Sequence, residues 1–252
     1  MEELKKRGEY FELIQTTYTR KIKKKYCTVF FNPEGEADFK TLCLINKVRK
    51  DAKIYMENDC VIRDSYINFF NMVRRPEANK IIHKIDIRGA YWNYAKHLGV
   101  VSKETNEYFL NLYEDERVKV AKKSRLKALG SLATKKYIVQ YINGKPDREN
   151  ELVTIEKTKP LYMEICRGID DIMQSCVRNI EGCFYYYWDC IFIDRNFSQK
   201  AVDFFKDQKY DVKIGETKLE YIQLEDTGFL LSKFDGKMYM TRKENRELLI
   251  MN

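Results

Sequence analysis

The sequence is poor in several residue types, and each shortage excludes a class of structure or site. Its 252 residues include only four prolines and eleven glycines, which argues against long disordered linkers. Two histidines, and seven cysteines without a C-x-x-C pair, leave no zinc-site spacing. We therefore expect free, buried thiols in a reducing compartment rather than zinc ligands.

Long apolar runs are missing as well. No apolar run approaches the roughly 20 residues that are needed to cross a bilayer. The residues from Glu2 to Arg7 are mostly charged, where a secretory signal would have its apolar segment. The sequence thus predicts a soluble, cytoplasmic protein without a membrane partner.

The composition is otherwise that of a globular protein, with 44% hydrophobic and 33% charged residues. The chain is long enough to bury a full core, in one domain or two. Its net charge of +8 is compatible with a polyanionic partner. The basic run at residues 21–25 could contact phosphates, or it could be a solvated face.

Apolar periodicity predicts alternating strands and helices. Strands are expected at residues 26–31 and 81–87, and in the tail between 210 and 240, where Asp235-Gly236 would form the last turn. Residues 184–194 are expected to form a strand or a tight hairpin. Helices are expected at residues 37–50, 65–73, 90–98 and 159–179, twice within 102–136, and after Ser198 as N-cap. This order predicts an α+β fold, in which helices back an antiparallel sheet that carries a small insertion of two helices.

A hairpin-like excursion is expected between the two-helix insertion and the long helix. Residues 137–142 and 152–155 have strand character, and Asn143-Gly144 between them is a strong turn signal. The polar stretch 145–151 makes the span too long for a two-residue loop. We therefore expect these polar residues to form an exposed connection.

Two aspartates stand inside apolar, β-rich runs: Asp86 in residues 81–87 and Asp189 in residues 184–194. An ionised carboxylate is costly to bury unless a cation meets it. Two such carboxylates on separate strands near the middle of one sheet predict a shared divalent metal. The alternative is that each aspartate marks a bend or a helix cap. Asp194 points to the other side of the strand by parity, so we treat it as a loop acid.

Phosphate-binding potential appears at two places. Arg88, Gly89, Ala90 and Tyr91 lie where a strand gives way to a helix, so backbone N–H groups suited to a triphosphate would gather near Asp86. Farther along, a basic helix that contains Arg125 and Lys127 could grip phosphates. Its alternative is a solvated basic face.

These stretches resemble the palm and fingers motifs of B-family DNA polymerases. Residues 86–92, D-I-R-G-A-Y-W, resemble the motif D-x-x-S-L-Y-P in their Asp and Tyr, although Gly, Ala and Trp replace Ser, Leu and Pro. Residues 188–192, W-D-C-I-F, resemble the motif D-T-D-S with Asp189 as the second Asp, and Tyr187 stands in the place of the first. Lys127 and Ser131 resemble parts of the fingers motif K-x-x-x-N-S-x-Y-G, and residues 237–239, K-M-Y, resemble the K-x-Y strand.

The resemblance covers about residues 80–240 and implies a minimal palm-and-fingers unit. Residues 81–101 and 159–252 would form the palm, and residues 102–158 the fingers helices with the hairpin. Residues 1–80 would form an α/β segment that packs on or completes the palm.

The function implied by the resemblance is template-directed DNA synthesis. Asp86 and Asp189 would hold Mg²⁺ or Mn²⁺ for two-metal transfer of dNTPs to a 3′-hydroxyl. The nucleotide-binding residues would be Arg88, Gly89, Ala90, Tyr91, Arg125 and Lys127, and the primer-binding residues Lys237 and Tyr239. The partners would be a DNA primer–template, dNTPs and a replication accessory protein. By analogy, a unit this small would come from a virus or a mobile element, and a viral protein would act in the host cytoplasm.

Two further interpretations stay open. The departures at Tyr187 and Trp92 favour a catalytically inactive, palm-like protein that binds nucleic acid or serves as a scaffold. The motif matches could also be chance, in which case the chain would be a structural or interaction protein.

Overall fold

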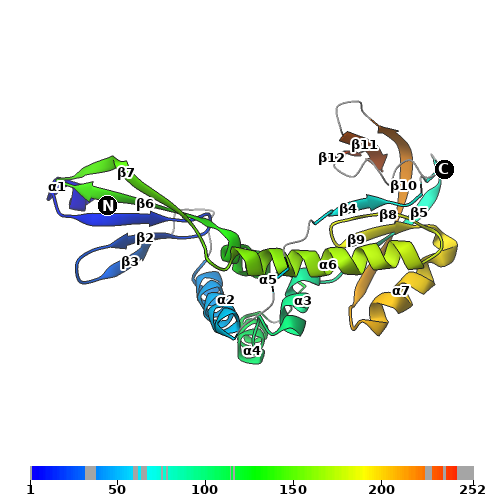
Figure 1. Cartoon of the computed structure of the whole chain (residues 1–252), viewed down its shortest axis with the longest axis horizontal. Coiled ribbons are helices and arrows are strands. Elements are labelled where there is room, and N and C mark those ends of the chain that lie inside the picture. The colour runs from blue at the N-terminus through cyan, green and yellow to red at the C-terminus, as the bar shows by residue number, and fades with distance from the viewer. Residues whose placement is uncertain are drawn as a thin grey trace. The chain divides into compact units, whose positions relative to one another are not determined.

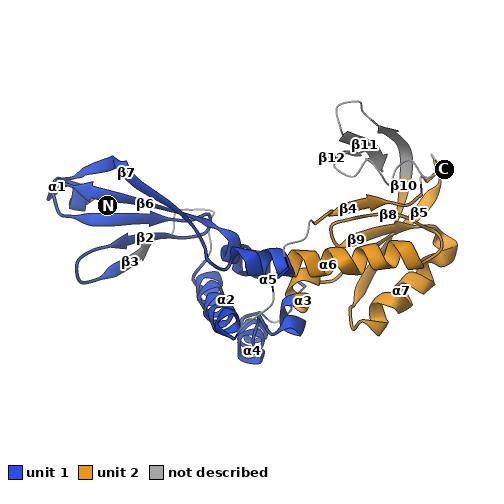
Figure 2. Cartoon of the chain, in the orientation of Figure 1, with its two compact units in different colours: residues 1–63, 95–164 blue, residues 64–94, 165–252 orange. Residues whose placement is uncertain are grey.

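A computed structural model of the chain shows an α+β fold with two antiparallel sheets and helices that back them, as the sequence predicts (Figure 1). It describes residues 2–31, 38–58, 62–63, 67–74, 76–77, 79–113, 115, 117–224, 229–234 and 237–242. The chain forms two compact units (Figure 2). Unit 1 comprises residues 1–63 and 95–164, and unit 2 comprises residues 64–94 and 165–252.

Unit 1 contains a five-stranded sheet in the order β3-β2-β1-β6-β7. Its strands are β1 (Phe11–Gln15), β2 (Arg20–Lys23), β3 (Thr28–Phe31), β6 (Lys135–Ile142) and β7 (Lys145–Ile155), and a short helix α1 (Glu2–Lys6) precedes them. Strand β1 pairs with β6, where the rings of Phe11 and Tyr141 stack at 4.5 Å. The N-terminal strands therefore share a sheet with the hairpin of residues 135–155, a different grouping from the N-terminal segment on the palm that we expected.

The helices of unit 1 are α2 (Phe39–Glu57), α4 (Lys103–Leu112) and α5 (Lys119–Gly130), followed by the 3₁₀ turn η1 (Ser131–Ala133). Asp38 caps α2 and Ser102 caps α4, each by accepting a backbone N–H of its first turn. Leu44, Val48, Phe109, Ala128 and Leu132 are fully buried where α2, α4, α5 and η1 pack together.

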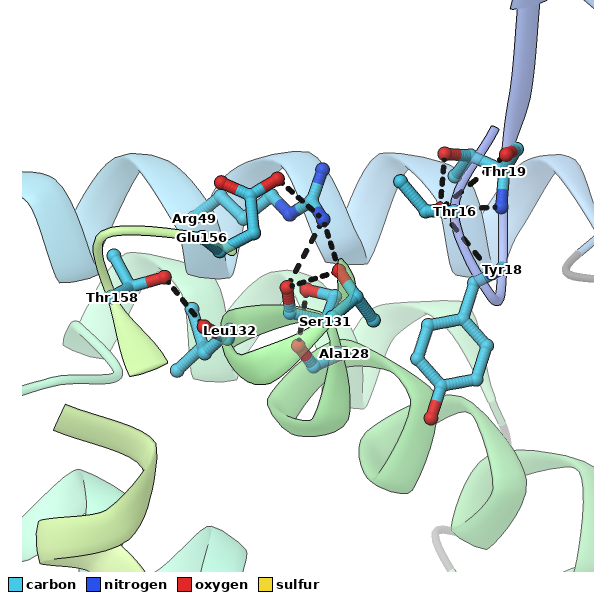
Figure 3. A network of polar contacts seen from close by, with 10 residues as sticks. Thr16, Tyr18, Thr19, Arg49, Ala128, Ser131, Leu132, Glu156 and Thr158 are labelled. Atoms are coloured by element: carbon cyan, nitrogen blue, oxygen red, sulfur yellow. Dashed lines mark hydrogen bonds and ion pairs between the residues drawn. The ribbon is translucent and has the colours of Figure 1, made fainter. Parts of the chain in front are cut away.

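Arg49 of α2 joins these helices to the strand segment that follows η1 (Figure 3). One guanidinium nitrogen donates to the backbone oxygen of Ser131 at 3.0 Å and to the hydroxyl of Thr134 at 3.1 Å. The same nitrogen lies 3.3 Å from the carboxylate of Glu156. Thr158 adds a hydrogen bond to the backbone oxygen of Leu132 at 2.8 Å. Both ends of the long hairpin are thereby fixed to the helices.

Unit 2 contains a seven-stranded sheet in the order β12-β11-β10-β5-β9-β8-β4. Its strands are β4 (Phe70–Met72), β5 (Ile81–Ile87), β8 (Cys183–Tyr187), β9 (Cys190–Ile193), β10 (Val212–Leu224), β11 (Phe229–Phe234) and β12 (Lys237–Arg242). The strand β5, which carries Asp86, pairs with β9, which Asp189 directly precedes. The two acidic segments are therefore neighbours in the middle of the sheet, as predicted.

One face of this sheet is covered by helices (Figure 1). The helices associated with this unit are α3 (Ala90–Leu98), α6 (Lys159–Asn179) and α7 (Ser198–Asp207), the last preceded by the 3₁₀ turn η2 (Arg195–Phe197). Side chains of α6 and α7 pack with Ile85, Ile87 and Ile191 in one buried cluster. Ile82, Cys190 and Phe192 belong to a separate cluster. Because neighbouring strand residues alternate between faces, Asp86 shares the face of Ile82, away from the helices. We call it the open face.

The predicted helix at residues 65–73 is wrong. Residues 70–72 form strand β4, and Phe69 before them has a φ of 54°, which a helix cannot contain. Backbone N–H groups of Asn68 and Phe69 donate to the carboxylate of Asp170 instead of to a helical turn. A tertiary contact therefore overrides the local helical spacing.

Two smaller predictions are also corrected. Residues 145–151 are strand and not a connection, because Ile142 pairs with Lys145 and leaves Asn143-Gly144 as a two-residue turn. Their side chains are mostly exposed at the sheet edge, so their polarity does not oppose strand formation. Ser198 is the first residue of α7 rather than its cap; its hydroxyl contacts His83 Nδ1 at 2.7 Å. The turn expected at Asp235-Gly236 lies outside the described residues.

Candidate two-carboxylate site

Asp189 lies in the turn of the β8–β9 hairpin. Tyr187 pairs with Cys190, so that only Trp188 and Asp189 remain between the strands. The N–H of Ile87 on β5 donates to the backbone oxygen of Asp189 at 3.0 Å. This bond attaches the turn to the end of the neighbouring acidic strand.

Asp86 lies on β5 beside the turn that contains Asp189. It is the register partner of Cys190, the residue next to Asp189. Both carboxylates are half-buried. Burial and, second to it, the negative charge of Asp86 raise the pKa of Asp189 to about 6, although the positive charge of Lys84 acts in the opposite direction. The two residues singled out from the sequence are therefore brought together, 103 positions apart in the chain.

Two lysines lie on the open face near the pair, and sequence reasoning missed both. Lys84 precedes Asp86 by two residues on β5, and Lys213 of β10 is the direct cross-strand partner of Asp86. Side chains of directly paired residues lie on one face of a sheet. Both lysines are exposed. The i, i+2 spacing from Asp86 could have indicated Lys84, but only the strand pairing reveals Lys213.

Cys190 is buried beside the carboxylates. Burial raises the pKa of its thiol far above the ordinary range, with the charges of Asp86 and Asp189 adding to that effect against Lys84. The thiol therefore stays protonated and packs as a small apolar group.

The donor set limits which metal the pair could hold. Within the described part of the chain, no group of three or more His, Cys, Asp or Glu side chains is arranged as a metal site. Mg²⁺ needs no such cage, because it is often held by one or two carboxylates together with water and substrate phosphates. Two carboxylates whose mutual repulsion raises a pKa fit that type of site, since a divalent cation would relieve the repulsion.

The strand-to-helix junction lies directly after Asp86, as predicted. Gly89 has a φ of 59°, and α3 begins at Ala90. The exposed Arg88 is fixed through its backbone, where its N–H donates to Asp211 at 2.8 Å and its oxygen accepts from the side chain of Asn93 at 2.9 Å. Ala90 is buried in the core and Tyr91 packs against it. This places the first turn of α3 at the same end of β5 as Asp86.

The predicted phosphate-binding residues of the basic helix belong to unit 1. Arg125 on α5 is buried, and its guanidinium lies 5.1 Å from the ring centre of Phe109. That position makes it part of the packing between α5 and α4 rather than a solvent-facing basic group. Lys127 is half-buried. Ser131, which takes the Asn place of the fingers motif, is fully buried and donates to the backbone oxygen of Ala128.

The remaining residues singled out from the sequence are the primer-contact candidates Lys237 and Tyr239, and the loop acid Asp194. Lys237 and Tyr239 lie on β12, in register with Phe234 and Ser232 of β11, and their side chains are outside the described part of the structure. Asp194 has no part in the carboxylate pair. It caps η2 and lies 2.9 Å from the ammonium group of Lys80, and these contacts lower its pKa.

Comparisons with known proteins give no match: no protein-family model, curated protein or solved structure matches this chain. Among the described helices, none combines the length and apolar character that crossing a membrane requires.

Proposed function

We propose that this chain is a template-directed DNA polymerase that joins dNTPs to a 3′-hydroxyl. The observation that carries the proposal is the meeting of Asp86 and Asp189 on the open face of an antiparallel sheet whose other face is covered by helices. Paired, half-buried carboxylates are suited to hold a metal against a phosphate. The order and context of the polymerase-like motifs support the same function.

Asp86 and Asp189 would hold Mg²⁺ or Mn²⁺. When bound, such an ion neutralises charge that develops on the attacking and leaving oxygens. Lys84 and Lys213 would add positive charge beside the pair and attract the polyanionic substrates. The first turn of α3, after Arg88 and Gly89, would bind the triphosphate through its N–H groups. Lys127 as a further triphosphate contact, and Lys237 and Tyr239 as primer contacts, remain part of the proposal by resemblance. Arg125 is no longer part of it, because its side chain is buried against Phe109.

Primer extension tests this function. We expect the full chain to extend a DNA primer on a template with dNTPs and Mg²⁺ or Mn²⁺. Asp86→Asn and Asp189→Asn should each reduce extension by at least about a hundredfold, because each removes a carboxylate that positions the ion. Asp203→Asn is the matched control, since Asp203 is exposed on α7, the helix that covers the opposite face. Extension that survives both site substitutions would refute the proposal.

A second candidate is an inactive palm-like protein that binds nucleic acid or serves as a scaffold. It is favoured by Tyr187, which is 39% exposed at the hairpin position where the resembled family has another carboxylate. A chain that extends no primer, yet binds DNA with an affinity that falls steeply as salt rises, would support this candidate. Failure of both assays would leave a structural or interaction protein.

A further inference from the structure

The turn that carries Asp189 also carries an exposed tryptophan. Trp188 is 41% exposed, and its neighbour Tyr187 is 39% exposed, with the two rings edge to face at 6.3 Å. Trp188 has a φ of 56°. Two-residue hairpin turns that need positive φ favour Gly, Asn or Asp, because a bulky side chain is strained there. The requirement to turn the chain therefore does not explain a tryptophan at this position.

The indole ring is supported on one side by Phe69. The two rings stack with their centres 4.3 Å apart and their planes 29° from parallel. The backbone N–H of Trp188 donates to the backbone oxygen of Phe69 at 2.7 Å. Phe69 itself has a φ of 54°, so both residues of this stacked pair have a left-handed backbone conformation.

A buried carboxylate fixes this support. Asp170 of α6 is 2% exposed and accepts the N–H groups of Asn68 at 2.9 Å and Phe69 at 3.0 Å. It also accepts the hydroxyl of Tyr186 at 2.5 Å. On the other side of the turn, Asp189 is attached to Ile87. The backbone of the turn that carries Trp188 and Asp189 is therefore held from both sides, and the indole ring is supported by Phe69.

We propose that Trp188 is a stacking surface for a nucleobase of the nucleic-acid strand that reaches Asp86 and Asp189. The proposal rests on the proposed function for its ligand class. Exposed aromatic rings bind single-stranded bases by stacking, whatever the base, because every base has a π-face. Trp188 directly precedes Asp189 in the turn, so a base that stacks on its ring would belong to the strand that reaches the two carboxylates.

Tryptophan fluorescence provides a readout that does not need catalysis. The chain contains two tryptophans, and Trp92 is only 2% exposed. Titrating the full chain with a short oligothymidylate in EDTA, without dNTPs, should quench the emission of Trp188. An abasic strand of the same length keeps the phosphates without the bases and should quench little. Trp188→Phe, which leaves Trp92 as the single tryptophan, should bind the oligothymidylate without quenching of the tryptophan emission.

Affinity separates stacking from phosphate contacts. Trp188→Leu should weaken oligothymidylate binding roughly tenfold, whereas Trp188→Phe should retain it within about threefold. The abasic strand should bind the wild-type chain and Trp188→Leu equally. Phe39→Leu, which changes an exposed aromatic residue of unit 1, should bind like the wild type.

Equal affinity of wild type and Trp188→Leu for the oligothymidylate would overturn the stacking proposal, as would full quenching by the abasic strand or no binding at all. Trp188-dependent binding by a chain that extends no primer would retain the stacking surface and remove only the polymerase function. If the chain extends a primer and Trp188→Leu leaves its affinity for DNA unchanged, the polymerase function stands and the stacking surface is refuted.

Discussion

At the scale of single residues, Asp189 is held in an environment that opposes its own charge. Burial and the like charge of Asp86 both disfavour the carboxylate, and together they raise its pKa to about 6. Without a bound cation, the ionised Asp189 therefore lowers the free energy of unfolding near neutral pH, which a neutral side chain at this position would not do. Such a cost is expected where a site is shaped for a ligand rather than for stability.

The pH dependence of stability follows from the sign of this shift. Because the folded-state pKa of Asp189 lies above the ordinary Asp value of about 3.9, its stabilising contribution is complete below about pH 4 and is lost as the pH rises through about 6. In EDTA, Asp189→Asn should therefore gain stability relative to wild type between pH 4.5 and 7.5, by up to about 2–3 kcal/mol. Urea unfolding of both chains across this range measures the difference. A constant difference would show that the carboxylate is not disfavoured in the folded state.

Asp170 should matter for stability as well as for the turn. Its carboxylate accepts two backbone N–H groups and the Tyr186 hydroxyl in a buried position. An amide can accept through only one oxygen, so Asp170→Asn should destabilise the fold by about 2–3 kcal/mol in urea unfolding. The neighbouring Asp171 is exposed, and Asp171→Asn should stay within about 0.5 kcal/mol of wild type. If the two substitutions lowered the free energy of unfolding by similar amounts, this would contradict the proposal that Asp170 holds the backbone at Asn68 and Phe69 in place.

At the scale of elements, the link between α6 and β8 depends on Gly182. Its φ is 88°, and a Cβ added there would meet the ring of Phe197 at 2.4 Å. Gly99, after α3, has a similar φ of 81° with open space around it. Gly99→Ala should therefore cost only the backbone strain of about 1–2 kcal/mol, and Gly182→Ala should cost clearly more. Thermal unfolding of both variants tests this, and equal losses would mean that Phe197 moves aside freely.

Much of the element pattern could be predicted because local signals and tertiary packing agree. The apolar stripe of α6 predicted the full length of that helix, residues 159–179. The β-rich runs around Asp86 and Asp189 predicted the central strands. Residues 65–73 could not be predicted in the same way, since Asp170, about a hundred positions later, satisfies their backbone. The pairing of β1 with β6 depends on contacts between distant segments that no local period encodes.

The candidate site shows the same limit. Asp86 and Asp189 were recognisable because each interrupts an apolar run. Lys213 became visible only through its register with Asp86, and Trp188 only through its backbone conformation and exposure. The sequence predicted that Arg125 contacts phosphates or lies on a solvated face, yet its side chain is buried with its guanidinium over the ring of Phe109 on α4.

At the scale of the whole molecule, both units are assembled from separate segments. Unit 1 takes residues 1–63 and 95–164, and unit 2 takes the rest. Two of the three boundaries, at 94/95 and 164/165, fall inside helices α3 and α6. Neither unit is one contiguous piece that could be cut out, and functional tests therefore need the full chain.

Direct binding of Mn²⁺ to the full chain tests the central claim, that Asp86 and Asp189 together hold a divalent cation. Free and bound Mn²⁺ can be counted by electron paramagnetic resonance at pH 7.5, where Asp189 is ionised. We predict saturable binding by the wild type and by Asp203→Asn, and at least about tenfold weaker binding by Asp86→Asn and by Asp189→Asn. Equal binding by all four chains, or none by the wild type with DNA and dNTP present, would contradict the claim.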